Sequence, residues 1–362
     1  MVQCLLRLIS IIIVLFVLLI IIIRLANTCK QRSTLFLIYE QYFSARNPIF
    51  RWNLSGITVA GVTNVNGNAS HLLNYPCYIA IDRSSTLYVT DRVNNRIQKF
   101  LKHQSIGKTV AGHADGTYGS SNYDLLNPAG LFVDSDENIY IGDSSNMRIQ
   151  LWAKNALIGS TVAAGCGNLS MNSTCQLQSA YGLDYDPITE EIYVADRHAH
   201  QILRFQYNSS KGEIVAGGNG KGFKRNQLHD PYAVIFDRQT NSLLIANAGA
   251  NNVVRWVVGA QEWHLVVGSR SGLTGKSSRL LQWPADIKVD SIGNLYVADR
   301  FNHRIQMFLV GQSQGITIAG IAGESGSDSQ HLNNPLSLAF DDQLNLYVAD
   351  HENHRVQKFI RY

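Results

Sequence analysis

Apolar residues are distributed in two different ways along this chain. Residues 5–26 form one long apolar run whose strongly polar members are Arg7 and Arg24, near its two ends. From about residue 51 onward, the apolar runs are short, rich in Val, Ile and Tyr, and bounded by Gly, Asn and Asp. A run of about 20 apolar residues spans a bilayer as a helix, whereas short runs of the second kind predict β-strands.

The long apolar run predicts that residues 1–26 are a transmembrane signal anchor and that residues 27–50 are a stalk. Arg side chains near the ends of such a helix reach the membrane interface. A cleaved signal peptide is the alternative interpretation. The apolar region of a signal peptide usually measures about 7–15 residues and precedes a small-residue cleavage site, whereas Arg24 stands where that site would begin.

Residues that follow the apolar run indicate on which side of the membrane the rest of the chain lies. Basic residues flank the run on both sides, so charge alone does not favour export of the following chain. Cys166 and Cys175 are spaced for a small disulfide-closed loop, as in an oxidising compartment, with two reduced surface thiols as the alternative. Acceptors for N-glycosylation also follow the run, at Asn53, Asn68, Asn168, Asn172 and Asn208. We therefore expect an extracellular or lumenal position for residues 51–362.

Six similar stretches repeat along the rest of the chain. Each has an Asp six residues after its start and an aromatic residue at its end, and a Thr-Val-Ala-Gly-like pattern lies between successive stretches. The starts are 51 to 53 residues apart, at Pro76, Pro128, Ala180, Pro231, Pro284 and Pro335. A fixed period of this length indicates a repeat architecture.

Each repeat contains four short strand-like runs, which is typical of a propeller blade. The last repeat stops after its third run, and residues 57–61 supply an extra fourth run before the first repeat. Pairing of this N-terminal strand with the last blade would close the ring and remove its exposed edges. We therefore predict an all-β, six-bladed propeller over residues 51–362.

An Asp followed five residues later by an Arg recurs between the second and third runs. Such a pair can form charge-assisted, bidentate hydrogen bonds across a turn, so we interpret these residues as structural. In the third repeat Gln201 replaces the Arg, and in the fourth both partners become Asn, at Asn247 and Asn252. The complete pairs are Asp91 with Arg96, Asp143 with Arg148, Asp299 with Arg304, and Asp350 with Arg355.

The runs Tyr296–Gln306 and Tyr347–Gln357, which read Tyr-Val-Ala-Asp followed by Asn-His-Arg, resemble the NHL-repeat family. The resemblance covers all six units and is weaker in the third and fourth. It implies a six-bladed propeller but not one function. Relatives include the propeller ends of tripartite-motif ubiquitin ligases that bind RNA or protein, a zinc-dependent lyase that matures amidated peptides, and extracellular sensor or adhesion modules.

The enzyme hypotheses depend on residues that would line the central channel. A catalytic zinc needs about three protein ligands, and no His stands at the start of the innermost strands. A lactonase-like calcium site needs six to eight oxygens, and Asp286 is the single carboxylate at those positions. We therefore predict no cofactor and no catalytic residue, with a lyase-like or lactonase-like enzyme kept as the alternative. A ubiquitin-pathway adaptor would lack its own RING domain, because the chain has no Cys-x-x-Cys pair.

The loops between repeats are the predicted binding surface, because rigid folds usually carry function on loops. Two of these loops, residues 218–230 and 269–283, are rich in basic residues, whereas two others are acidic. We expect the basic loops to bind a protein or an acidic glycan, while RNA binding is disfavoured by the compartment and by the few aromatic residues. Ordinary solvated loops are the alternative. The basic residues are Lys221, Lys224, Arg225, Arg270, Lys276 and Arg279.

Composition and charge agree with this organisation. The chain is 45% hydrophobic and 16% charged, which excludes a disordered or acidic-tail protein. Its formal net charge of +4 lies entirely in residues 1–50, which hold five basic residues and one acidic residue. Residues 51–362 hold 26 basic and 26 acidic residues, so a general attraction to nucleic acid is not expected from the propeller.

Overall fold

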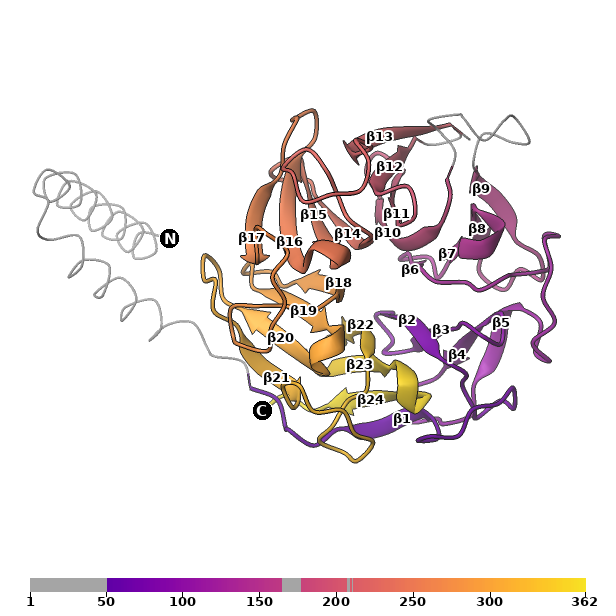
Figure 1. Cartoon of the computed structure of the whole chain (residues 1–362). Coiled ribbons are helices and arrows are strands. Elements are labelled where there is room, and N and C mark those ends of the chain that lie inside the picture. The colour runs from indigo at the N-terminus through magenta and orange to yellow at the C-terminus, as the bar shows by residue number, and fades with distance from the viewer. Residues whose placement is uncertain (1–50, 165–176, 207–208, 210) are drawn as a thin grey trace, which may run out of the picture. The chain divides into compact units, whose positions relative to one another are not determined.

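Short β-strands run through the whole of the unit Trp52–Tyr362. The computed structural model describes residues 51–164, 177–206, 209 and 211–362. In these residues 24 strands form six four-stranded antiparallel sheets arranged around an axis (Figure 1). The prediction of an all-β, six-bladed propeller is therefore confirmed.

Several predicted features lie outside the described residues. They are the signal anchor over residues 1–26, the stalk over residues 27–50, the pair Cys166 and Cys175, and the acceptors Asn168, Asn172 and Asn208. Within the described ranges, no helix is both long and apolar enough to span a bilayer. The membrane anchor therefore stays a prediction.

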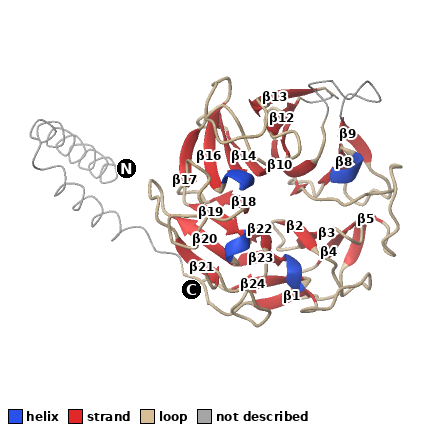
Figure 2. Ribbon diagram, viewed as in Figure 1, coloured by secondary structure: helices blue, strands red, loops and turns tan. Residues whose placement is uncertain are grey.

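Each blade runs from an inner strand at the axis to an outer strand at the rim (Figure 2, strands in red). The inner strands are β2 (Pro76–Ile81), β6 (Leu131–Val133), β10 (Ala180–Asp186), β14 (Pro231–Asp237), β18 (Pro284–Val289) and β22 (Pro335–Phe340). The second strands are β3 (Leu87–Asp91), β7 (Ile139–Asp143), β11 (Glu191–Asp196), β15 (Ser242–Asn247), β19 (Leu295–Asp299) and β23 (Leu346–Asp350).

The third and fourth strands complete the blades. The third strands are β4 (Arg96–Phe100), β8 (Arg148–Trp152), β12 (Gln201–Phe205), β16 (Asn252–Val257), β20 (Arg304–Phe308) and β24 (Arg355–Phe359). The fourth strands are β5 (Lys108–Gly112), β9 (Ser160–Ala164), β13 (Gly212–Gly217), β17 (His264–Gly268), β21 (Ile316–Gly320) and β1 (Ile57–Gly61). One-turn 3-10 helices follow four second strands, at η1 (Ser144–Asn146), η2 (Ala248–Ala250), η3 (Arg300–Asn302) and η4 (His351–Asn353).

The core lies between neighbouring blades, because each sheet buries both of its faces. The second strands are therefore buried over nearly their whole length, for example every residue of β3 and β19. Between blades three and four, Tyr193 and Ile202 of one sheet share a buried cluster with Val234 and Leu243 of the next. Burial on both faces explains why these strands read as continuous apolar runs rather than as strict alternation.

The ring is closed in the way the sequence predicts. Strand β1 pairs antiparallel with β24, from Ile57 opposite Lys358 to Gly61 opposite Arg355, so both ends of the region build blade six. Before β1, the Trp52 Nε1 donates to the carbonyl of Leu344 at 2.8 Å. At the axis, the six inner strands pack one against the next in an unbroken circle. This closure removes the edges that an open sheet array would expose.

Candidate functional site

The turns after the second strands and the long loops between blades lie at the same ends of the blades. The side chain of Asp91, at the end of β3, accepts a hydrogen bond from the backbone N–H of Asn74, just before β2. Asp143, Asp299 and Asp350 make the same contact to Leu126, Gln282 and Asn333, at 2.6 to 2.7 Å. Each Asp therefore joins a turn to the end of a long loop, and we call this end of the propeller the turn face.

The predicted Asp–Arg pairs also hold the long loops. Arg96 Nε lies 2.7 Å from Asp91 Oδ2, and its two terminal nitrogens donate to four backbone carbonyls in the flanking loops, those of Asn68, Ala69, Leu72 and Ala114. Arg148, Arg304 and Arg355 make equivalent pairs at 2.7 to 2.8 Å and bind three loop carbonyls each. We call each Asp–Arg–loop arrangement a clamp.

The two degenerate repeats carry weaker versions of the clamp. In blade three, Gln201 Nε2 donates to Asp196 at 3.2 Å, and burial raises the pKa of Asp196 to about 6. In blade four, Asn247 donates to Asn252 at 3.1 Å, and Asn252 donates to the carbonyl of Ser269 at 2.7 Å. Replacement of both partners leaves no buried charge in blade four, whereas blade three keeps a buried carboxyl group without a cation.

The histidines of the turns connect neighbouring blades. His200, His303 and His354 adopt positive φ angles of 54° to 55°, and their Nδ1 atoms accept from backbone N–H groups of the following blade. Asn95 and Asn251 accept in the same way through their side-chain oxygens. Burial lowers the pKa of all three histidines, which favours the neutral form that can accept. The geometry thus makes these histidines structural rather than metal ligands.

Three arginines converge on the mouth of the channel at the turn face. Arg92, Arg197 and Arg300 each follow the Asp that ends a second strand, in blades one, three and five. A terminal nitrogen of Arg92 and one of Arg197 both donate to the hydroxyl of Tyr181, at 3.0 and 2.9 Å. Arg300 donates to the hydroxyl of Tyr232 at 3.4 Å. We call Arg92, Arg197 and Arg300 the arginine triad.

Aromatic rings support the triad from the side of blades three to five. The guanidinium carbon of Arg197 lies 5.0 Å from the ring centre of Tyr181, 4.8 Å from that of Tyr232 and 5.9 Å from that of Trp283. The rings of Tyr181 and Tyr232 are themselves in edge contact at 4.8 Å. Cation–π contact with several rings fixes the position of the Arg197 charge without neutralising it.

Tyr78 crosses the channel below the triad. Its hydroxyl donates across the ring to the carbonyl of Tyr232 at 2.6 Å and lies 3.2 Å from that of Ala285. A Cβ atom at Gly182 would lie 2.8 Å from this hydroxyl, so the glycine gives the space that Tyr78 needs. The neighbouring thiol of Cys77 is fully buried, and burial raises its pKa. The contacts of Tyr78 cross the axis, so its side chain forms a floor beneath the triad.

Two further ionisable residues near the axis have structural partners. His351 donates from Nδ1 to the carbonyl of Pro76 at 3.0 Å, and burial lowers its pKa to about 3. Asp286, the channel carboxylate noted from sequence, accepts from the backbone N–H groups of Ile287 and Leu338 and from the hydroxyl of Ser337. These contacts tie blade five to blade six and occupy the oxygens that a metal would need.

The basic residues predicted to bind a partner lie on exposed parts of the long loops, but two of them have acidic neighbours. Lys221 lies 3.8 Å from Asp230, and Arg225 lies 3.0 Å from Glu262, which belongs to a different loop. Lys224, Arg270, Lys276 and Arg279 complete the set. The basic sector is therefore less charged than the loop sequences indicate.

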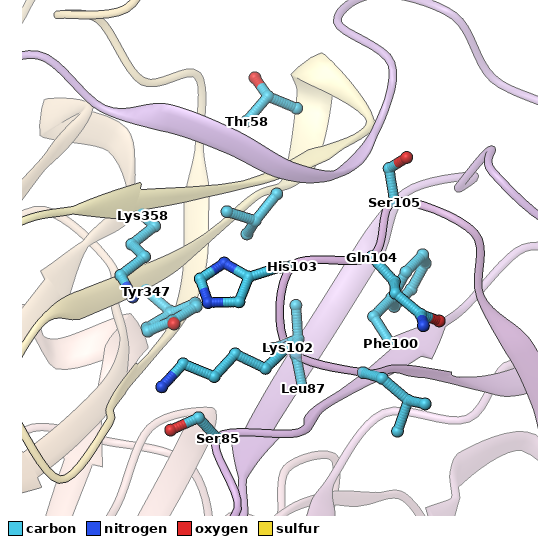
Figure 3. A pocket seen from close by; sticks show the side chains of 12 residues that line it. Thr58, Ser85, Leu87, Phe100, Lys102, His103, Gln104, Ser105, Tyr347 and Lys358 are labelled. Atoms are coloured by element: carbon cyan, nitrogen blue, oxygen red, sulfur yellow. The ribbon is translucent and has the colours of Figure 1, made fainter.

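Two surface hollows lie between neighbouring blades, apart from the triad. One, of about 230 Å³, lies between blades six and one, where Lys102 and His103 approach Tyr347 and Lys358 (Figure 3). The other, of about 550 Å³, lies between blades one and two beside Trp152. Neither hollow includes a residue of the triad, of the clamps or of the predicted basic sector.

Comparison with known proteins agrees with the repeat pattern. The family model described as "NHL repeat" matches residues 281–308 and 332–359, which lie in blades five and six. Two of the six repeats therefore match the NHL-repeat model. The chain is 28% identical over 349 residues to NHL repeat-containing protein 2 from Bos taurus, a match that covers 79% of this chain. The chain spans only 46% of that relative's length, less than two thirds.

Solved structures share the fold of this chain at low sequence identity. An auxiliary nutrient binding protein from Bacteroides thetaiotaomicron superposes with a TM-score of 0.63 and 15% identity, over 86% of this chain and 77% of its own. A gluconolactonase from Xanthomonas campestris gives a TM-score of 0.59 and 13% identity, over 85% and 98%. At such identities the likeness concerns the fold, and binding proteins and enzymes both share it.

The arginine triad is the part of this site that sequence reasoning missed. The signal was an Arg directly after the repeat Asp in the first, third and fifth units, at Arg92, Arg197 and Arg300. In the sequence this position reads as a variable turn residue, because the three arginines come together only when the ring closes and places alternate blades around one mouth.

Two of the predicted glycosylation acceptors, Asn53 and Asn68, lie in the described residues, and both are exposed.

Proposed function

We propose that this chain is a non-enzymatic binding module that presents its turn face to a protein partner. Residues 5–26 would hold it in a membrane, with the propeller on the extracellular or lumenal side. The observation that carries the proposal is the set of clamps, which bind the long loops to the blades through buried Arg side chains. Loops fixed before binding lose little conformational freedom when a partner arrives.

The clamped loops carry exposed apolar side chains. Tyr118, Phe223 and Leu273 are 66%, 48% and 64% exposed, and each lies on a different long loop. Phe223 contacts Gly272 of the next loop, where an added Cβ atom would overlap its ring, so neighbouring loops also touch one another. Rigidly held aromatic and apolar side chains are the usual anchors of protein interfaces.

The channel-centred enzyme has less support. A metal-dependent lyase or lactonase needs several His, Cys, Asp or Glu side chains placed around one ion. In the described residues, no three such side chains are brought together in that way. The gluconolactonase likeness is a likeness of fold. The rigid, clamped loop surface therefore supports a binding function better than the channel supports a metal-dependent enzyme.

A crosslinking experiment on cells tests the binding proposal. The full chain is expressed with a tag, treated with a membrane-impermeant crosslinker, and compared with a Y118S/F223S/L273S variant. We expect a specific crosslinked species with the parent protein and a reduction of about tenfold or more with the variant, since buried aromatic anchors dominate such interfaces.

An I106S/L157S variant is the matched control, because these residues are 65% and 89% exposed at the opposite ends of the strands. It should give the same crosslinked species as the parent protein. Loss of the species in the control but not in the loop variant would contradict a partner at the turn face, as would absence of any saturable species.

A further inference from the structure

The arginine triad differs from the clamp arginines in how it uses its hydrogen-bond donors. A guanidinium group carries five N–H donors. Arg96 uses its Nε for Asp91 and its terminal nitrogens for four carbonyls, and it is 1% exposed. Arg92 and Arg300, in contrast, each donate one side-chain hydrogen bond to a tyrosine within the described residues, and both are partly exposed. Arg92 also contacts the thiol of Cys77, and the Nε of Arg300 is buried, but both arginines keep terminal N–H donors that no described residue accepts.

The triad also lacks matching negative charge. Arg197 lies 3.6 Å from Asp230, which shares its charge with Lys221 at 3.8 Å. Across the described ranges, Arg92 and Arg300 have no carboxylate within ion-pair distance. The buried carboxylate of Asp286, on the inner strand β18, is paired with Lys288 at 3.4 Å. At least two positive charges at the mouth therefore have no anionic partner in this part of the chain.

The three charges are held close together although each would repel the others. Arg92 and Arg197 share the hydroxyl of Tyr181, and Arg300 and Arg197 both contact Tyr232. Tyr181 accepts two hydrogen bonds and keeps its own proton for donation. The folded protein holds these like charges at short range and leaves them incompletely paired. Folding has already overcome the electrostatic repulsion between the guanidinium groups, so an anion that binds between them gains their full attraction.

From this arrangement we propose that the mouth of the channel binds a small dianion, a phosphate or dicarboxylate group, through Arg92, Arg197, Arg300 and the hydroxyl of Tyr181. Guanidinium groups match the planar carboxylate and the tetrahedral phosphate equally well, so the two share one recognition chemistry. Tyr78 forms the floor, so the ligand enters from the turn face and stops there. This site lies within the surface of the proposed function, yet it does not depend on a protein partner.

Titration calorimetry on the full chain in detergent tests this site. Inorganic phosphate and succinate are the two probes, each measured at low and at physiological ionic strength. We expect saturable one-to-one binding of at least one probe, weakened by salt. The stronger probe identifies whether the natural group is a phosphate or a carboxylate.

Single-site variants assign the binding to the triad. R92Q and R300Q should each lower the affinity for the probe by about tenfold or more, as expected for loss of a charge-assisted hydrogen bond. R270Q is the matched control, since Arg270 is an exposed arginine of the same face outside the triad. Thermal unfolding with and without the probe gives a second measurement, because a bound ligand raises the unfolding midpoint. The rise should be smaller in R92Q and R300Q than in the parent protein.

Absence of saturable binding by both probes at low ionic strength would overturn the proposal. Equal weakening by R270Q and R300Q would also overturn it, because that result indicates general attraction to the face. If R92Q does not fold, R300Q and Y181F decide the matter. The crosslinked partner is measured separately, so failure of the anion site and failure of the binding module give different results.

Discussion

At the scale of single residues, Asp196 is a buried carboxyl group that lacks the arginine partner of the complete clamps. Its side chain is fully buried, and Gln201 stands where four other blades have an Arg. Burial raises the pKa of Asp196 to about 6, from the usual 3.8. The folded protein therefore binds a proton more tightly here than the unfolded chain does, so this group's contribution to stability is fully present below pH 4 and is lost as the pH rises through 6.

We predict that Gln201→Arg will stabilise the protein at neutral pH. The new guanidinium would lie next to Asp196, lower its pKa and remove the cost of its buried charge, which at 1.36 kcal/mol per pH unit amounts to about 3 kcal/mol. Urea unfolding at pH 5 and pH 8 measures the effect. The gain over the parent protein should be larger at pH 8, and an equal gain at both values would contradict the role given to Asp196.

At the scale of elements, a clamp couples a turn to two loops through one buried arginine. In blade five, burial raises the pKa of Asp299 while Arg304 opposes this, and both side chains are almost inaccessible. Removal of one partner leaves a buried charge alone, which costs about 3–5 kcal/mol, whereas replacement of both can be much less harmful. Blade four, with Asn247 and Asn252, is a natural example of the double replacement.

We predict that R304N will be more destabilising than the double variant D299N/R304N, which copies blade four into blade five. Denaturant unfolding gives the free energies, and amide hydrogen exchange over residues 275–280 reports the loop that Arg304 holds. Exchange should accelerate in both variants because both lose the loop carbonyl contacts. The coupling interpretation is wrong if the double variant is less stable than R304N.

Much of this element-scale structure was predictable from the chain. The repeat spacing placed the strands, and the Asp–Arg spacing of five residues indicated pairs across a turn. The spacing did not reveal that Arg96 or Arg304 also binds loop carbonyls 24 to 28 residues earlier, because those bonds depend on how the loops return over the blade. It also did not reveal that Glu262 faces Arg225, since the two lie on separate loops.

At the scale of the whole molecule, closure joins the first and last strands of the propeller. The β1–β24 pairing places Asn53 and Asn68 on either side of the closing strand, and both side chains are exposed. Glycan attachment requires exposed acceptors and passage through the secretory compartment. The state of these two residues therefore reports which side of the membrane holds the propeller.

We predict that the full chain expressed in animal cells will shift to higher mobility after treatment with an N-glycosidase. The N53Q/N68Q variant should show a smaller shift, because two exposed acceptors are removed while the other predicted acceptors remain. The variant should keep the thermal stability of the deglycosylated parent protein. A full chain whose mobility does not change on treatment would contradict the lumenal or extracellular position.

The sequence by itself determined the six repeats, their four strands and the closing strand, because short-range alternation and a period of 51 to 53 residues are local properties of the chain. It also indicated the clamp pairs, whose partners are five residues apart. Only the tertiary structure decided the arginine triad, since Arg92, Arg197 and Arg300 lie about 100 residues apart and meet through ring closure. The floor at Tyr78 likewise arises from contact between opposite blades, which no local pattern records.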